Sequence, residues 1–188
     1  MIQNCEIENE IRDIKKEDRM IKQIKHLGEK CLREESKPVE TIDPSLKNLV
    51  HDMIETMHSA NGVGLAPQIG VNLQLAVIEL DQKSLVLVNP SIQKSWGREI
   101  SEEGCLSIPG VREPVQRATN LIVKAKTIEG KPFEFEVNGL LARAVQHELD
   151  HLQGILFIDR ISKARRLQLK KILTKIEAGE SIEEESSS

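Results

Sequence analysis

The clearest helical pattern in the chain follows Asp43-Pro44. Apolar residues recur there at spacings of three and four, namely Leu46, Leu49, Val50, Met53, Ile54 and Met57. Such spacing places one apolar stripe along an α-helix. An N-cap Asp followed by Pro at the first helical position marks the start, and Asn61-Gly62 marks the end. We therefore predict an amphipathic helix that packs on a core.

Short runs of β-branched and large apolar residues occupy the middle of the chain. Leu75–Leu80 and Leu85–Val88 predict an antiparallel pair of strands, with Asn89-Pro90 ending the second. Leu121–Ile128 and Phe133–Val137 flank a Glu-Gly-Lys turn and predict a hairpin. Strands in the middle, with helices before and after them, indicate an α+β domain with mostly antiparallel sheets.

The last apolar stripe runs along a basic segment. Between Ser162 and Ala178 the stripe consists of Leu169, Ile172, Leu173 and Ile176, and around it lie Lys163, Arg165, Arg166, Lys170, Lys171 and Lys175. We predict a C-terminal helix here. Two interpretations stay open: either the basic residues contact ribosomal RNA, or they form the solvated face of a helix that packs on the domain.

The stretch QHELDH, at residues 146–151, carries the strongest chemical signal. On a helix His147 and His151 lie about 40° apart around the axis and one turn apart along it, so both imidazoles can reach one metal ion. Glu148 lies close to the same ion, where a carboxylate can take a proton from water and pass it on. The arrangement indicates metal-assisted hydrolysis. The alternative is a helix with two surface histidines and an ordinary polar pair.

A catalytic metal usually has three protein ligands and one open position. The segment Glu103–Gly110, which we interpret as too irregular for a plain strand, offers a third ligand in Cys105. A thiolate and two imidazoles would complete such a site. A buried free thiol at a turn is the alternative for Cys105, and it is the interpretation that we favour for Cys5 and Cys31.

Composition narrows the range of partners. Three Phe, one Trp and no Tyr argue against stacking platforms for single-stranded nucleic acid. A net charge of −4 gives no overall attraction to DNA or anionic lipid, and no apolar run approaches the roughly 20 residues of a membrane span. The three cysteines lack the spacing of a disulfide framework, which fits a reducing compartment. We therefore expect a cytoplasmic protein without DNA or membrane partners.

Three motifs in this order resemble the peptide deformylases, which remove the formyl group from the initiator methionine of new polypeptides. They read GVGLAPQIG (62–70), EGCLS (103–107) and QHELDH (146–151), and similarity extends from about Ile24 to Arg160. The resemblance implies helices and antiparallel sheets around a central metal-binding helix. It also implies one divalent ion, with ferrous iron expected and zinc, nickel or cobalt as substitutes, held by Cys105, His147 and His151.

The resemblance also implies catalytic roles and a substrate, the N-formylmethionyl nascent peptide. Glu148 takes a proton from water and later protonates the leaving amine. The Gln68 side chain and the Leu106 N–H stabilise the charge that develops on the formyl oxygen. The substrate would bind as an added strand, with its methionine in an apolar pocket. The residues expected to bind it are Gly62, Val63, Gly64 and Leu65.

The glycine loop departs from the family pattern in its length. The family normally has one more residue before the Pro-Gln or Thr-Gln pair, whereas Ala66 is followed directly by Pro67 here. The three glycines of the motif leave the backbone free to adjust. We therefore expect the loop to re-route and to keep the Gln68 amide within hydrogen-bond reach of the open metal position.

We divide the chain into three parts: a charged N-terminal extension (1–19), a catalytic domain that includes the C-terminal helix (20–178), and an acidic, disordered tail (179–188). Two other functions stay open at this point. One is a different HExxH hydrolase such as a peptidase, and the other is a ribosome-associated binding module that keeps the metal without turnover. The EGCLS motif argues against a peptidase, because most such enzymes use His or Glu where this chain has Cys105.

Overall fold

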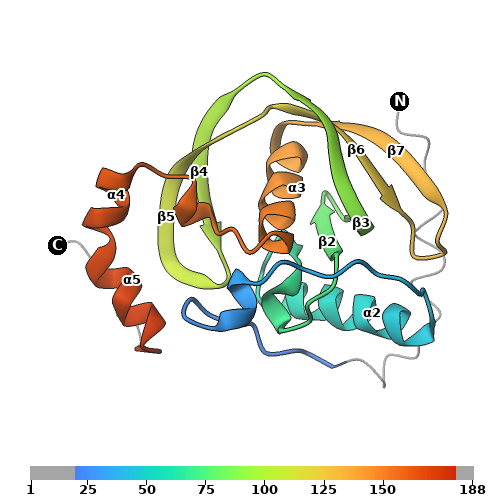
Figure 1. Ribbon diagram of the computed structural model, residues 1–188, viewed down its shortest axis with the longest axis horizontal. Coiled ribbons are helices and arrows are strands. Elements are labelled where there is room, and N and C mark those ends of the chain that lie inside the picture. Colours follow the sequence, from blue (N-terminus) through green and yellow to red (C-terminus); the bar gives the residue numbers. More distant parts are fainter. Residues whose placement is uncertain (1–19, 181–188) are drawn as a thin grey trace.

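The computed structural model describes residues 20–180, and Figure 1 shows their arrangement. The predicted extension 1–19 and residues 181–188 of the predicted acidic tail lie outside the described residues. One antiparallel sheet has the strand order β1-β2-β3-β6-β7, formed by β1 (Gly64–Leu65), β2 (Leu75–Leu80), β3 (Lys83–Trp96), β6 (Asn120–Lys126) and β7 (Pro132–Asn138). A separate hairpin consists of β4 (Glu99–Cys105) and β5 (Ile108–Arg117).

Helices cover both faces of the larger sheet. They are α2 (Pro44–Ser59) on one face and α3 (Gly139–Leu152) on the other. Two further helices, α4 (Lys163–Gln168) and α5 (Lys170–Glu177), follow α3 in the chain, and short 3₁₀ turns occupy Lys30–Arg33, Pro67–Ile69 and Phe157–Asp159. In Figure 1, α3 stands between the larger sheet and the β4–β5 hairpin, while α4 and α5 lie on the outer side of that hairpin. The predicted α+β class, with antiparallel sheets around a central helix, is confirmed.

The alternation of side chains along β2 explains why the strand is apolar from Leu75 to Ile78. Val77 faces α2 in one core cluster, whereas its neighbours Ala76 and Ile78 face α3 in another. A third cluster lies between the hairpin and the C-terminal helices and includes Val115 and Leu173. Because α3 contributes to the core on one side and borders the hairpin on the other, its position is set by both.

Two of the predicted elements match the structure closely. The helix after Asp43 is α2, and the Asp43 carboxylate accepts a hydrogen bond of 2.9 Å from the Leu46 N–H, as an N-cap does. The strand Leu75–Leu80 is β2 with the same bounds. Among residues 20–180, no helix is both long and apolar enough to cross a membrane.

The prediction that Asn89-Pro90 ends a strand was wrong, because β3 continues to Trp96. The pairing of β3 with β6 shifts register between Val88 and Ser91, and Asn89 has a positive φ of 51°. Such a bulge accommodates a proline, which cannot donate a ladder hydrogen bond. The Asn89 side chain also bonds to both the N–H and the carbonyl of Val39. The strand is thereby bent where the sequence suggested an end.

Two further predictions need correction. The segment Glu103–Gly110, predicted to be too irregular for a plain strand, is a hairpin: it holds the end of β4, the two-residue turn Leu106-Ser107 and the start of β5, with a register shift between Gly104 and Cys105. The predicted C-terminal helix is two helices, which break at Leu169. Leu173 and Ile176 of its apolar stripe are nevertheless buried against the hairpin.

Candidate active site

Three predicted metal ligands meet at one point between α3 and the β4–β5 hairpin. His147 and His151 lie one turn apart on α3, and Cys105 is the last residue of β4. One donor atom from each lies within 4.8 Å of the others, and Sγ of Cys105 is 3.2 Å from Nε2 of His151. Among residues 20–180 no other group of three such side chains comes together. The HExxH helix therefore faces a thiol from a separate element.

The chemistry of this donor set fits a transition-metal ion. One sulfur and two imidazole nitrogens form a three-ligand set that suits iron or zinc and leaves a position for a reactant. Burial lowers the pKa of His151 well below its usual value, which favours the neutral imidazole that a metal ligand requires. Burial opposes the protonation of His147 as well, but hydrogen bonds to Cys105 and Glu103 raise its pKa well above the usual value.

Glu103 orients the His147 ring through its Nδ1 atom. Its Oε2 lies 3.2 Å from Nδ1 of His147, and its two oxygens accept 2.9 Å bonds from Nε and Nη2 of Arg117. Burial opposes ionisation of this carboxyl, but the hydrogen bonds from Arg117 and His147 outweigh it and lower its pKa to about 2. The carboxylate therefore holds Nδ1 as a donor and leaves Nε2 of His147 for a metal.

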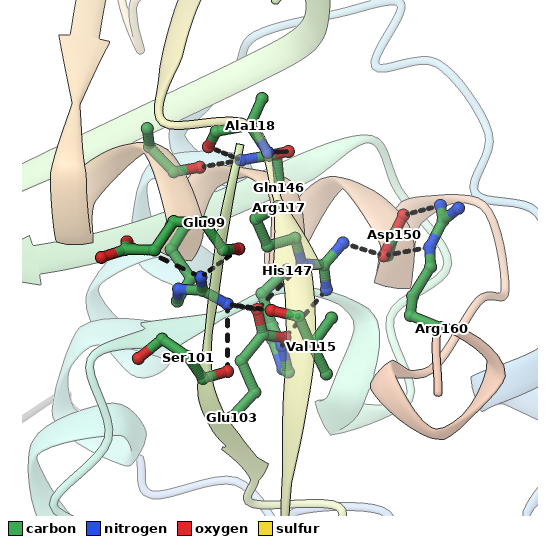
Figure 2. Close-up of polar contacts among 12 residues, drawn as sticks. Glu99, Ser101, Glu103, Val115, Arg117, Ala118, Gln146, His147, Asp150 and Arg160 are labelled. Atoms are coloured by element: carbon green, nitrogen blue, oxygen red, sulfur yellow. Dashed lines mark hydrogen bonds and ion pairs between the residues drawn. The ribbon is translucent and has the colours of Figure 1, made fainter. Parts of the chain in front are cut away.

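A buried chain of charges continues from this carboxylate to the surface. Figure 2 shows Arg117 between Glu103 and Asp150, with Arg160 on the far side of Asp150. Nη1 of Arg117 donates to Asp150 at 2.6 Å, and Nε of Arg160 donates to Asp150 at 3.0 Å. Sequence reasoning assigned these residues no role. The available signal was that Glu103 and Asp150 each lie inside one of the motifs EGCLS and QHELDH.

Gln146 attaches the same helix to the short connection between β5 and β6. Its amide donates to the Ala118 carbonyl at 2.9 Å and accepts from the Ala118 N–H at 3.0 Å, which Figure 2 also shows. Both residues lie next to parts of the site, since Ala118 follows Arg117 and Gln146 precedes His147. The first residue of the QHELDH motif is thus structural, and it fixes the rotation of α3.

Glu148 and Gln68 lie together beside the metal cluster. Glu148 is buried, and this burial is the main reason that its pKa is raised. The Gln68 side chain donates to Oε2 of Glu148 at 3.1 Å, and its own oxygen accepts a hydrogen bond from the Ala66 N–H. Gln68 is thus buried and turned toward Glu148. The re-routing expected of this loop stays a prediction.

The residues expected to bind substrate lie along one edge of the larger sheet. Gly64 and Leu65 form β1, which is an outer strand and pairs only with β2 in the described chain. Val63, just before β1, is 44% exposed, a large fraction for a valine. Leu106 follows Cys105 in the turn of the hairpin and packs against the core under α2. The free edge of β1 can accept a further strand.

Gly64 is a glycine because Glu148 occupies the space of its missing side chain. A Cβ at Gly64 would overlap Oε1 of Glu148 and would lie 2.8 Å from its Cδ. Gly64→Ala should therefore displace the carboxylate and lower turnover about a hundredfold, since a shift of about 1 Å has such an effect. Steady-state rates and metal content per chain test this, with metal content expected to stay unchanged.

Gly130→Ala is the control for a glycine replaced far from the site. A Cβ there meets only the end of the Ile42 side chain at 3.5 Å, although its φ of +83° adds some strain. This variant should be less stable but fully active below its melting temperature. Equal turnover in Gly64→Ala and Gly130→Ala would show that the Glu148 position does not depend on Gly64.

Comparison with known proteins assigns the family. The sequence profile of the family described as polypeptide deformylase matches residues 21–167. The peptide deformylase of Dictyoglomus thermophilum is 47% identical over 142 residues, which cover 75% of this chain and 93% of that protein.

Solved structures agree with the sequence comparison. A peptide deformylase from Legionella pneumophila has a TM-score of 0.79 at 47% identity, covering 84% of this chain and 96% of that one. The enzyme from Thermus thermophilus has a TM-score of 0.80 at 38% identity, covering 85% and 99% of the two chains. With its Cys-His-His cluster, its fold and its sequence in agreement, the chain belongs to the polypeptide deformylase family.

Proposed function

We propose that this protein is a peptide deformylase, a hydrolase that removes the N-formyl group from the initiator N-formylmethionine of newly made polypeptides and releases formate. The observation that carries this conclusion is the meeting of Cys105, His147 and His151 at one point with Glu148 beside them, in a chain of this family. Such an enzyme acts in protein biosynthesis.

We further propose that the three ligands hold one divalent ion and that this ion is ferrous iron. When bound, the ion supplies a Lewis acid that activates water and polarises the formyl oxygen. Zinc, nickel and cobalt suit the same sulfur and nitrogen donors and would substitute for iron. The family is metal-dependent, and the cluster of one thiol and two imidazoles supports this assignment.

In this proposal Glu148 moves the proton. It takes a proton from the attacking water and delivers it to the nitrogen of the methionine as the C–N bond breaks. The raised pKa of the buried carboxyl favours the protonated form that the second step needs. Its hydrogen bond to Gln68 holds one of its oxygens in place.

The negative charge on the formyl oxygen requires donors, and we assign this role to Gln68 and Leu106. The Ala66 N–H holds the oxygen of the Gln68 amide, so the NH₂ group faces Glu148. One of its hydrogens serves that contact, and the second remains for the substrate. Leu106 would add its backbone N–H from the turn that follows Cys105.

The peptide itself would lie along the free edge of β1. Gly62, Gly64 and Leu65 offer backbone groups for an added strand, and Val63 offers an exposed apolar side chain to the methionine. A formyl group in such a pose would stand beside Glu148, because the Glu148 carboxylate fills the space where a side chain of residue 64 would lie.

Formate release tests the function. The anaerobically purified, iron-loaded protein is incubated with a formyl-Met peptide and, separately, with the same peptide lacking the formyl group. A deformylase releases formate from the first and leaves the second intact. Cleavage of the unformylated peptide would identify a peptidase. A metal-loaded protein inactive on both would identify a binding module.

We also propose that the enzyme works in the cytoplasm, at the ribosome, where nascent chains emerge. The C-terminal helices support this proposal: Leu173 and Ile176 are buried, while Lys170 and Lys171 are exposed. Two other basic residues of these helices are engaged elsewhere, since Arg165 pairs with Glu113 and Arg166 with Asp159. The exposed lysines are thus the best candidates for contact with RNA phosphates.

Changing both Lys170 and Lys171 to Glu should weaken ribosome binding without altering activity on free peptide. Phosphate contacts release counterions, so the affinity of the unmodified protein should also fall steeply as salt rises. Co-sedimentation with ribosomes at several salt concentrations measures both effects. Binding that is absent, or that is insensitive to salt, would leave the basic face as a solvated surface only.

A further inference from the structure

Arg143 connects the metal helix to the hairpin that carries the third ligand. It lies on α3 one turn before His147, and its side chain is only 9% exposed. Its Nη1 donates to Oε1 of Glu103 at 2.7 Å and to the Val115 carbonyl at 2.9 Å. The guanidinium thus reaches both strands of the β4–β5 hairpin.

Further contacts extend along β4. Nη1 of Arg143 also approaches the Ser101 carbonyl at 3.4 Å, and Nη2 donates to the Glu99 carbonyl at 3.2 Å. Figure 2 shows Glu99, Ser101 and Glu103 in sequence along one strand, with Val115 on the strand beside it. One side chain therefore holds alternate residues of β4 and the strand paired with it.

The ligands themselves come from these two elements. Both histidines are on α3, whereas Cys105 ends β4, and the hairpin belongs to a different sheet from the one that α3 covers. The distance between the thiol and the imidazoles therefore depends on how the helix is placed against the hairpin. Glu103, on β4, contacts two residues of α3: it accepts a hydrogen bond from Arg143, and its other oxygen lies at Nδ1 of His147.

We propose that Arg143 is a positioning residue of the metal site: by tying α3 to the β4–β5 hairpin, it sets Cys105 at ligand distance from His147 and His151. The inference rests on the proposed metal site. The guanidinium fork suits this task, because it makes several directed bonds at once from one rigid plane. Without it, the carbonyls that it bonds lose a donor and the hairpin can move relative to the helix.

The matched control is Arg165, which also reaches the hairpin from a helix. Its Nε donates to the buried carboxylate of Glu113 on β5 at 2.6 Å, but its side chain is 51% exposed and it has no contact with Glu103. Arg143→Met and Arg165→Met each remove one arginine that ties a helix to the hairpin. Only Arg143→Met removes a tie between ligand-bearing elements.

The experiment measures metal binding, with cobalt(II) as the probe. Competition with a chromophoric chelator gives the affinity, the sulfur-to-cobalt charge-transfer band reports the bond from Cys105, and thermal unfolding of the metal-free protein reports stability. We expect Arg143→Met to bind cobalt about 10–100-fold more weakly, with a weakened or shifted charge-transfer band. Arg165→Met should stay within twofold of the unmodified protein, and Arg143→Lys should recover part of the affinity.

Unchanged affinity and an unchanged band in Arg143→Met would overturn the proposal, whatever happens to its stability. If Arg143→Met does not fold, Arg143→Lys decides: a normal band and normal affinity would assign Arg143 to stability alone, and a weakened band would support positioning. The proposed function is judged separately on the unmodified protein. Cobalt binding without formate release from the iron-loaded protein would refute the deformylase activity and leave the positioning role standing, whereas formate release by a protein that binds no cobalt would refute the positioning role and leave the activity standing.

Discussion

Replacing Glu148 by alanine should leave the metal content of the protein unchanged and lower formate release by about 10²–10⁴-fold. This range is the usual contribution of a positioned proton-transfer group. The Glu148 carboxylate lies outside the three-ligand cluster, so its loss removes no donor to the metal. It is also buried beside Gln68, where bulk water cannot readily replace it. The measurements are kcat/KM on a formyl-Met peptide and metal per chain.

Glu113→Ala is the matched control for Glu148→Ala. Glu113 is a buried glutamate as well, but it lies on β5 and pairs with Arg165. Its removal should lower stability and leave kcat/KM within a few-fold of the original value. Undiminished turnover in a metal-loaded Glu148→Ala protein would contradict the proton-transfer role.

Changing Cys105 to alanine should remove the metal itself, and with it essentially all activity. The cluster would keep two imidazoles and lose its one sulfur donor. The loss of affinity should exceed the roughly 10–100-fold that changes to outer-shell partners cause. Metal analysis after gel filtration, followed by chelator competition, measures this. Loss of metal in Cys105→Ala, beside unchanged metal content in Glu148→Ala, would distinguish a metal ligand from a residue that only transfers protons.

Cys31→Ala is the control for the thiol. Cys31 is also a free, partly buried cysteine, and it packs in the same core cluster as Cys105. Burial raises the pKa of its thiol, which favours the inert, protonated form. This variant should bind one metal per chain with normal affinity. Full metal content in Cys105→Ala would mean that the thiol is not a ligand.

Elements with a complete local signal were predictable from the sequence. The helix that begins after Asp43 has a stripe, a cap and a stop signal, and the strand Leu75–Leu80 is apolar on both faces. The hairpin of β4 and β5 lacked such a signal, because β4 is mostly exposed and polar and Pro109 and Pro114 interrupt β5. Its regularity comes from pairing with a neighbour, which one strand alone does not reveal.

The two histidine ligands could be predicted from a local sequence pattern, whereas the charged network that supports them could not. His147 and His151 share one helix face, so their spacing alone brings them together. Glu103 instead meets Arg117 from 14 residues away and Arg143 from 40 residues away, and Arg117 meets Asp150 from 33 residues away. In a chain with 30% charged residues such pairs have no local pattern. They become visible only when the fold places them.

Anaerobic titration of metal-free protein with ferrous iron tests the central claim most directly. Formate release from a formyl-Met peptide should rise in proportion to added iron and reach a plateau at one equivalent per chain, because each chain holds one Cys-His-His cluster among residues 20–180. Prior chelation should abolish the activity, and added iron should restore it. Formate release that is independent of iron and persists in chelator, or its absence from the fully loaded protein, would contradict the account.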